Sequence, residues 1–370
     1  METPLSFRIF ATDGRARTGV LETAHGSVPF PAFMPVGTRA AVKAVDPEEV
    51  RGSGASMVLG NTYHLMLRPG EEVIRRAGGL ARFMGWHGPT LTDSGGFQAF
   101  SLGERVKISD QGVVFASHLD GTRIQLTPER AAEVQGAIGA DIAMALDECA
   151  PGDADRDAVA RAMVRTTAWA ERQLAVARPA GQALFGIVQG GIHEDLRRAH
   201  IEELAGLPFD GLAVGGLSVG EPVPEMYRVL HAVAHLLPVK RPRYLMGVGT
   251  PADILEAVEC GVDLFDCVLP TRNARNGQAF VRGGRINIKQ ARHSEDPLPL
   301  DPQCSCPCCS RFERRYLRHL FLAGEMLVSR LLTLHNLHHF GTLMAGIREA
   351  IAAGRLAGFK RDWLSPREDP

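Results

Sequence analysis

Two groups of residues in this 370-residue sequence have types and spacings that could do chemistry. The first is the run Cys304-Ser305-Cys306-Pro307-Cys308-Cys309, which His335 follows. Thiolates and an imidazole in a Cys₃His set form a common tetrahedral zinc site, and four protein ligands leave no position for water. The run therefore predicts one structural zinc ion per chain.

The cysteine run offers one ligand too many. Four cysteines could bind the ion and leave His335 idle, or three could bind it together with His335. Because adjacent Cys308 and Cys309 rarely both bind one ion, one of them should lie outside the site. A helix over residues 311–332 could deliver His335 from its far end. An unligated cluster is the remaining alternative, although four reduced thiols would be prone to oxidation.

The second group consists of three aspartates, Asp93, Asp147 and Asp266, each of which closes a short apolar run. One such aspartate taken alone could merely cap the next helix. Three in equivalent positions are harder to explain in this way. Retaining glycosyl transfer uses one carboxylate as the nucleophile and another as the acid/base. The three aspartates therefore indicate that chemistry.

Glycine pairs follow several of the same runs, at residues 94–96, 189–191 and 215–216. Glycine lets backbone amides approach a flat ligand closely, although tight turns are its commoner use. Phe97 and Met246 lie near the ends of predicted strands and could stack on the two faces of a flat ring. Ordinary core packing is the alternative for both side chains.

Eight apolar runs separated by helical segments must position these residues. Asp46, Thr127 and Thr250 each precede a proline and read as helix N-caps. Helical spacing also extends over residues 155–178 and 193–205. Eight alternating units favour an α/β fold of the (β/α)₈ (TIM) barrel type over a doubly wound sheet, with the active site at the carboxyl ends of the strands. The predicted strands are residues 32–36, 56–60, 89–93, 141–147, 184–189, 212–215, 244–247 and 262–266.

Three segments depart from this alternation. Residues 5–30 have the pattern of antiparallel strands and predict an N-terminal β cap. Residues 101–126 predict a β-hairpin insertion after the third strand. Residues 271–340 hold the cysteine run and predict a zinc-binding subdomain, inserted in or extending the last βα unit. We expect residues 1–370 to form a single TIM-barrel domain around these additions.

Composition limits the location and the partners. The net charge is −1, so contact with nucleic acid would need a local basic patch. The N-terminus has no apolar signal region, and no run of 18 apolar residues predicts a membrane span. The cysteines are scattered or bunched rather than spread in pairs, which is typical of a reduced, cytoplasmic protein.

Taken together, the motifs resemble those of the tRNA-guanine transglycosylase family in its bacterial form. The resemblance covers nearly the whole chain in one order, and the cysteine run matches as well. The stretches that carry it are TDSGGFQ (92–98), LDEC (146–149), GIVQGG (186–191), GGLSVGE (215–221), YLMGVGTP (244–251) and FDCVLPTR (265–272).

The resemblance implies a role for each aspartate. Asp266 matches the nucleophile that attacks the anomeric carbon of the ribose and expels guanine. Asp93 matches the acid/base group for the leaving and entering bases. Asp147 matches the carboxylate that accepts hydrogen bonds from the N–H edge of guanine. The enzyme would exchange guanine at the anticodon wobble position of GUN tRNAs by double displacement, in queuosine biosynthesis.

The resemblance also implies the other contacts. Gln189 and the Gly216 amide would hold the carbonyl of the base, and the Leu217 carbonyl would accept the aminomethyl arm of 7-aminomethyl-7-deazaguanine. Met246 and Phe97 match the stacking plates, although many members carry Tyr in place of Phe97. Structural zinc would be bound by Cys304, Cys306, Cys309 and His335, which leaves Cys308 outside the site.

Base choice and partners follow from the same comparison. Val219 and Cys149 resemble the bacterial pocket, which favours 7-aminomethyl-7-deazaguanine over the bulkier queuine. The tRNA anticodon stem-loop needs a basic surface, and residues 271–330 carry eleven basic and five acidic residues. A solvated helix face is the alternative. The resemblance assigns Arg272 and Arg275 to RNA contact.

A homodimer is the expected assembly. Phe312, Tyr316 and His319 recur at helical spacing and share one face. Core packing would explain this spacing, but family members form homodimers through this region.

Three other functions fit the sequence less well. A non-catalytic partner subunit would lack Asp93 and Asp266. A zinc-dependent RNA-binding module on an inert barrel would leave the aspartates unexplained. A metabolic barrel enzyme such as an aldolase would need a Schiff-base lysine or a catalytic metal at a strand end, and the sequence has neither.

Overall fold

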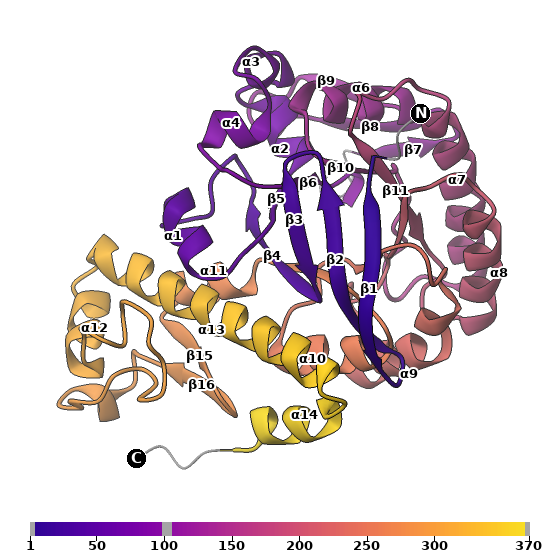
Figure 1. Ribbon diagram of the computed structural model, residues 1–370. Helices are drawn as coiled ribbons and strands as arrows, with labels where there is room; N and C mark the ends of the chain where they lie inside the picture. Colours follow the sequence, from indigo (N-terminus) through magenta and orange to yellow (C-terminus); the bar gives the residue numbers. More distant parts are fainter. Residues whose placement is uncertain (1–3, 98–105, 367–370) are drawn as a thin grey trace.

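Eight parallel strands close into a barrel in the computed structural model, which describes residues 4–97 and 106–366 (Figure 1). Each of the eight predicted apolar runs overlaps one of them, so the predicted barrel is confirmed. Strands that follow one another along the barrel also pair in space, and β14 pairs with β4 to close the ring. The strands are β4 (Ala32–Gly37), β5 (Val58–Gly60), β6 (Thr90–Thr92), β10 (Ile142–Met144), β11 (Ala183–Val188), β12 (Gly211–Val214), β13 (Arg243–Leu245) and β14 (Leu264–Cys267).

Helices return the chain from one strand to the next. The predicted caps are present: Asp46 and Thr250 form capping boxes, and the Thr127 side chain accepts from the Arg130 amide. Apolar faces of these helices pack on the outside of the barrel. The helices are α1 (Pro47–Gly52), α2 (Thr62–Leu67), α3 (Glu71–Arg76), α4 (Leu80–Met84), α6 (Pro128–Ile138), α7 (Arg156–Leu174), α8 (Glu194–Ala205), α9 (Val223–Val233) and α10 (Pro251–Glu259).

The predicted N-terminal cap is a three-stranded antiparallel sheet of β1 (Ser6–Asp13), β2 (Ala16–Thr23) and β3 (Gly26–Phe30), drawn in front of the barrel in Figure 1. It covers the amino ends of the strands. Arg17 forms a buried ion pair with Asp263 just before β14, at 2.6 Å, and the His25 amide donates to Asp141 just before β10. The carboxyl ends of the strands are therefore left for the mouth.

The insertion after the third barrel strand forms antiparallel strands, as predicted. It has three rather than the two of a simple hairpin: β7 (Lys107–Ser109), β8 (Gly112–Ala116) and β9 (Arg123–Leu126). The first part of the predicted range, residues 101–105, lies outside the described residues.

A long excursion separates the last barrel strand from the helix that packs beside it. It contains α11 (Leu269–Arg275), the hairpin β15 (Gln278–Val281) and β16 (Gly284–Asn287), the cysteine run and α12 (Arg314–Leu322). Then α13 (Met326–Ala352) and α14 (Leu356–Leu364) follow. The predicted helix over 311–332 is wrong, because the chain turns at Gly324, where φ is +74°, and His335 lies within α13.

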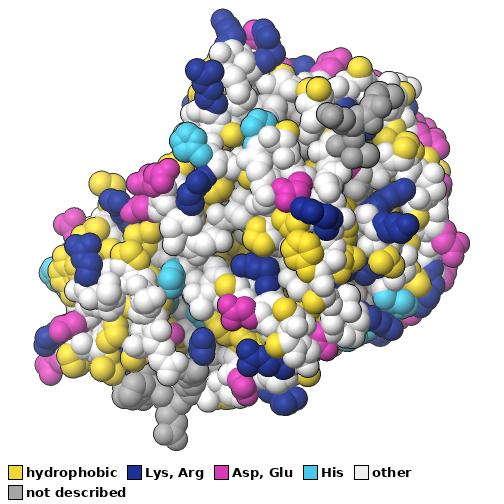
Figure 2. Space-filling model, in the orientation of Figure 1, with side chains coloured by type: hydrophobic (Ala, Val, Ile, Leu, Met, Phe, Trp, Pro, Cys, Tyr) yellow, Lys and Arg dark blue, Asp and Glu magenta, His cyan; other side chains and the backbone are white. Residues whose placement is uncertain are grey.

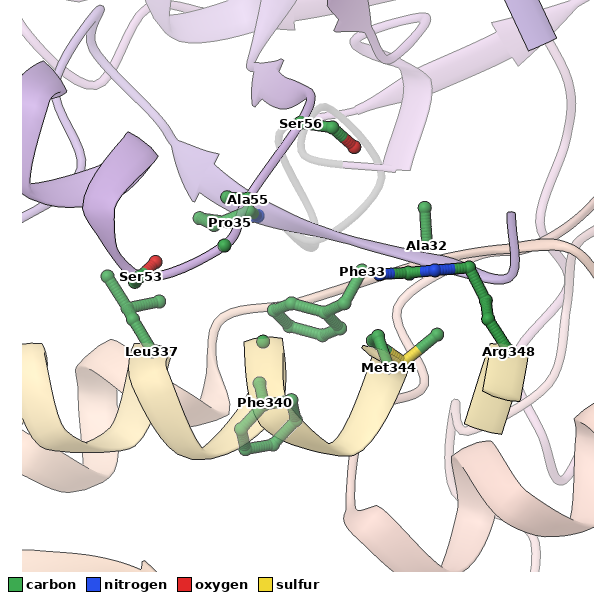
Figure 3. A pocket seen from close by; sticks show the side chains of 12 residues that line it. Ala32, Phe33, Pro35, Ser53, Ala55, Ser56, Leu337, Phe340, Met344 and Arg348 are labelled. Carbon is green, nitrogen blue, oxygen red and sulfur yellow. The ribbon is translucent and has the colours of Figure 1, made fainter. Parts of the chain in front are cut away.

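Helix α13 packs directly on the first barrel strand (Figure 3). Phe340 meets Phe33 of β4 with ring centroids 4.7 Å apart, and the Arg348 side chain donates to the Pro31 carbonyl. Gly341 allows the close approach, because a Cβ there would lie 1.9 Å from the Ser53 carbonyl oxygen. This seam ties the cysteine-containing excursion to the barrel.

Over the described residues, none of the helices has the length and apolar character needed to cross a membrane. On the face shown in Figure 2, basic and acidic side chains are interspersed, in keeping with the near-neutral net charge.

Candidate active site and metal centre

A cavity of about 600 Å³ opens at the carboxyl ends of the barrel strands. Eight of the predicted site residues line it, together with Val219 and Cys149. This is the end of a (β/α)₈ barrel where catalytic groups lie. The eight are Asp93, Phe97, Asp147, Gly216, Leu217, Met246, Asp266 and Arg272.

Asp266, in β14, is held by two donors on one carboxylate oxygen. Its Oδ1 accepts from the Tyr244 hydroxyl at 2.6 Å and from the Gly247 amide at 2.7 Å. Burial raises the pKa of Asp266, and these two hydrogen bonds oppose the rise. With Oδ1 engaged, Oδ2 is the oxygen that can approach a ligand in the cavity.

Asp93 follows β6 and is buried, with 9% of its surface exposed. Its Oδ1 accepts from the Thr62 amide at 2.8 Å and its Oδ2 from the Asn61 side chain at 2.5 Å. Both partners lie at the start of α2, where the helix dipole also favours a carboxylate. Burial raises the pKa of the Tyr244 phenol, and the carboxylates of Asp266 and Asp93 raise it further. Both carboxylates line the same cavity.

Asp147 follows β10 and is also buried. Its Oδ2 accepts from the Gln189 side chain at 2.6 Å, and its Oδ1 from the Ser94 hydroxyl at 3.4 Å. Burial raises the pKa of Asp147 to about 6, and the hydrogen bonds from Gln189 and Ser94 only partly offset this. Gln189 itself lies behind the cavity lining, against Asp147.

The turn after β12 presents backbone groups to the cavity. Ser218 has a positive φ of 59°, and the Glu221 carboxylate accepts from the Ser218 and Val219 amides. In a trans peptide the carbonyl points opposite to the amide N–H that follows it. Because the Ser218 N–H points at Glu221, the Leu217 carbonyl points away from Glu221.

The two predicted stacking side chains differ in environment. Met246 is partly buried and packs against the barrel interior, whereas Phe97 is 52% exposed at the rim. Arg272 also lines the rim, and its charge lowers the pKa of neighbouring Arg275, although burial of Arg275 contributes more. The Arg275 side chain donates to the Thr271 carbonyl. Both arginines lie on α11, directly after Asp266.

A second site is formed by the cysteine run and α13. The ligand atoms of Cys304, Cys306, Cys309 and His335 all lie within 4.8 Å of one another. His335 directs Nδ1 at the three sulfurs, at 3.6, 3.6 and 3.2 Å, while its Nε2 donates to the Phe280 carbonyl at 2.7 Å. This bond fixes the tautomer that leaves Nδ1 free to bind a metal.

The same geometry decides between the two ligand sets. Cys308 is fully buried in the same small hydrophobic cluster as the other cysteines of the run, but it does not belong to the four-residue group. Three thiols and one imidazole that converge in this way fit a metal ion, so the structure contains a Cys₃His metal site.

Several residues of the mouth were not identified from the sequence. Tyr244 holds Asp266, and Asn61 holds Asp93. Glu221 holds the turn after β12. Tyr244 lies in the short strand β13 and Asn61 directly follows β5, so position near a strand's carboxyl end was a usable signal for both. No such signal existed for Glu221, whose role depends on the fold of its own turn.

The raised pKa of Asp147 predicts a pH-dependent cost to stability. A carboxyl whose folded pKa exceeds its unfolded value loses stability as pH rises between the two, here from about 4 to about 6. Asp147→Asn removes the charge. The side-chain amide of Gln189 can flip to keep a hydrogen bond with the new carboxamide. At pH 7.5 we expect the free energy of unfolding of the variant to exceed that of the native chain by about 1–3 kcal/mol. Thermal melts should show this advantage shrinking at pH 5.

Asp263→Asn is the matched control, because it leaves Arg17 buried without its carboxylate. This variant should be less stable than the native chain at both pH values. Equal stability of Asp147→Asn and the native chain at pH 7.5 would contradict the prediction.

The fold and the two sites define a class: a (β/α)₈ barrel enzyme with converging carboxylates at its mouth and a separate Cys₃His metal site. Comparison with known proteins agrees. The family model described as Queuine tRNA-ribosyltransferase matches residues 13–369. The chain belongs to the queuine tRNA-ribosyltransferase family, whose members are tRNA-guanine transglycosylases.

The relatives match over nearly their full length. A queuine tRNA-ribosyltransferase of Sorangium cellulosum is 60% identical over 360 residues, which cover 97% of this chain and 91% of the relative. One of Ruegeria sp. is 53% identical over 98% of this chain and 96% of its own length. One of Oleidesulfovibrio alaskensis is 53% identical over 100% and 99%, respectively.

Proposed function

We propose that this enzyme replaces guanine at the wobble position of GUN tRNAs with 7-aminomethyl-7-deazaguanine, in queuosine biosynthesis. The observation that carries the proposal is the pair Asp93 and Asp266, two carboxylates that line the same cavity at the mouth of the barrel. A pair of carboxylates is the equipment for double displacement at an anomeric carbon.

In the first displacement, the Asp266 carboxylate attacks C1′ of the ribose. The C1′–N9 bond breaks, its electron pair leaves with guanine, and Asp93 supplies a proton to the departing base. In the second, Asp93 takes the proton from N9 of the incoming base, which attacks C1′ and releases Asp266. In each step one bond to C1′ breaks as another forms, and the intermediate between the two steps is a covalent ribosyl-aspartate.

Recognition of the base uses the remaining groups of the cavity. Asp147 accepts from the N–H edge of the base when ionised, and the base replaces the contact that Asp147 makes with Gln189. Gln189 and the Gly216 amide then serve the base carbonyl, while Met246 and Phe97 stack on the ring. The pKa of Asp147 near 6 implies that exchange weakens as pH falls below that value.

The aminomethyl group of the incoming base requires an acceptor. The Leu217 carbonyl, oriented away from Glu221, is suited to this because Glu221 engages the amide that follows it. Val219 and Cys149 line the cavity and limit its width. Competition between 7-aminomethyl-7-deazaguanine and queuine in an exchange assay would decide between the two bases.

Zinc is the ion we propose for the Cys₃His site, because it takes tetrahedral sulfur and nitrogen ligands. The site supplies four protein ligands, so the ion is structural. All seven cysteines are free thiols, which fits a reducing, cytoplasmic setting.

Arg272 and Arg275 on α11 would contact the anticodon loop. Arg272 lines the mouth directly, and the target base must be splayed out of its stack to reach Asp266. The basic excess of residues 271–330 would extend this contact along the RNA backbone.

A homodimer through α12 is part of the proposal. Tyr316 is 40% exposed, and its ring stacks on that of Phe312 with centroids 5.5 Å apart. Leu322 at the end of α12 and Met326 at the start of α13 are 60% and 87% exposed. Exposed apolar side chains in this segment favour an interface over core packing. We expect Tyr316→Ala to shift sedimentation at low micromolar concentration towards the monomer. Val164→Ala, an exposed apolar change on α7, is the control and should sediment like the native chain.

Incorporation of labelled guanine into an unmodified GUN tRNA tests the function. The native chain should label this tRNA and leave a transcript with adenine at the wobble position unlabelled. No incorporation by a folded, metal-loaded native chain would contradict the catalytic proposal and favour a partner-subunit role.

A further inference from the structure

Helix α8 holds the base-binding turns from behind. Arg197, in its first turn, is fully buried. Its Nε donates to the Gly191 carbonyl at 2.6 Å, and its Nη2 donates to the carbonyls of Gly215 and Gly216 at 2.9 and 3.0 Å. One side chain thus joins the turn after β11 to the turn after β12.

These contacts set the direction of the Gly216 amide. In the trans peptide between Gly215 and Gly216, the N–H of Gly216 points opposite to the Gly215 carbonyl. Because Arg197 binds that carbonyl from behind, the N–H is directed to the side of the cavity. There it lies near Cys149, where it acts against the burial that raises the pKa of the Cys149 thiol. This is the amide that would meet the carbonyl of a bound base.

Arg197 is also a buried charge without a carboxylate partner among the described residues, since its acceptors are all backbone carbonyls. Burial lowers the pKa of Arg197 to about 10, so it stays charged at neutral pH. Leaving a cation unpaired in a protein interior is costly. Because the chain keeps this energetic cost at the wall of the cavity, the buried charge of Arg197 indicates a functional role.

The next turn of α8 supports the same wall. His200 is fully buried, and its Nδ1 accepts from the backbone amide of Gln189 at 2.9 Å. Its Nε2 lies 3.2 Å from the Thr167 hydroxyl. Gly190 allows this close packing, because a Cβ there would lie 2.5 Å from Cγ of Arg197. Arg197 and His200 therefore hold the two turns that carry the Gly216 amide and Gln189.

We infer that Arg197 is a positioning residue for the exchange reaction, which turns the Gly216 amide towards the base and places a fixed positive charge behind it. The inference rests on the proposed function. When the C1′–N9 bond breaks, negative charge spreads from N9 over the guanine ring to its carbonyl oxygen. A preorganised donor at that oxygen stabilises the transition state more than the bound substrate.

The test compares kcat and KM for labelled guanine exchange in Arg197→Met, Arg197→Lys and the native chain. We expect Arg197→Met to lower kcat about 10- to 100-fold with KM for tRNA unchanged. Arg197→Lys should recover part of the loss, because it keeps the charge but cannot bind both turns. Arg198→Met is the matched control: its exposed side chain donates to Ala232, and the variant should keep the native kcat.

Ile201→Ala separates positioning from stability. Ile201 is a core residue of the same helix, so this variant should melt at a lower temperature and keep its kcat. Native kcat in folded Arg197→Met, or an equal loss of kcat in Ile201→Ala, would overturn the inference. If Arg197→Met does not fold, native kcat in Arg197→Lys would overturn it. Failure of the native chain to exchange guanine would instead overturn the proposed function.

Discussion

Asp266→Asn is expected to lower the rate of guanine exchange by about 10⁴-fold or more. The carboxamide oxygen can still accept from the Tyr244 hydroxyl and the Gly247 amide, so the local structure should be kept. What is lost is the anionic nucleophile, without which no ribosyl ester forms. The measurement is labelled guanine incorporation, with a denaturing gel that detects the covalent adduct of protein and tRNA.

Asp120→Asn provides the control, because this exposed aspartate lies in the turn between β8 and β9, away from the mouth. It should exchange guanine at the native rate. Adduct formation by Asp266→Asn would contradict the assignment of the nucleophile and leave Asp93 as the candidate for that role.

Loss of one metal ligand should have the largest effect on stability. In Cys309→Ala we expect the metal content to fall well below one ion per chain. The melting temperature should drop, because the free energy of unfolding falls by several kcal/mol. Residues 288–313 contain only one short 3-10 helix, η3 (Ala291–His293), so regular secondary structure contributes little to holding this segment. Metal analysis by mass spectrometry and thermal melts would measure both effects.

Cys308→Ala is a matched control one residue away. Its thiol is buried in the same hydrophobic cluster as the ligand cysteines but lies outside the ligand set. The variant should keep one metal per chain and lose only about 1 kcal/mol from the smaller side chain. Metal loss in Cys308→Ala with retention in Cys309→Ala would show that the ligand set is wrong.

The metal site also bears on the mouth through short contacts. His335 donates to Phe280, and its neighbour Asn336 accepts from the Phe280 amide and donates to the Pro270 carbonyl in α11. Arg272 lies two residues after Pro270. Disorder in the cysteine segment of Cys309→Ala is therefore expected to weaken tRNA binding as well as stability.

The sequence by itself determined the barrel, the aspartates at its mouth and the cysteine site, because these signals are local. A strand-end aspartate follows its own apolar run, and closely spaced cysteines are near one another in any compact fold. The caps at Asp46, Thr127 and Thr250 could be predicted for the same reason. Each cap side chain accepts a hydrogen bond from the backbone amide three residues later.

Only the tertiary structure decided which groups meet across long separations. Three features depend on how distant segments pack: the separation of α12 from α13 at Gly324, the exclusion of Cys308 from the four-residue metal group, and the contact of Tyr244 with Asp266. The same is true of Arg197, which reads in sequence as one more charge on an amphipathic helix. Its partners are carbonyls of turns that only the closed barrel brings together, and backbone carbonyls have no signature in the sequence.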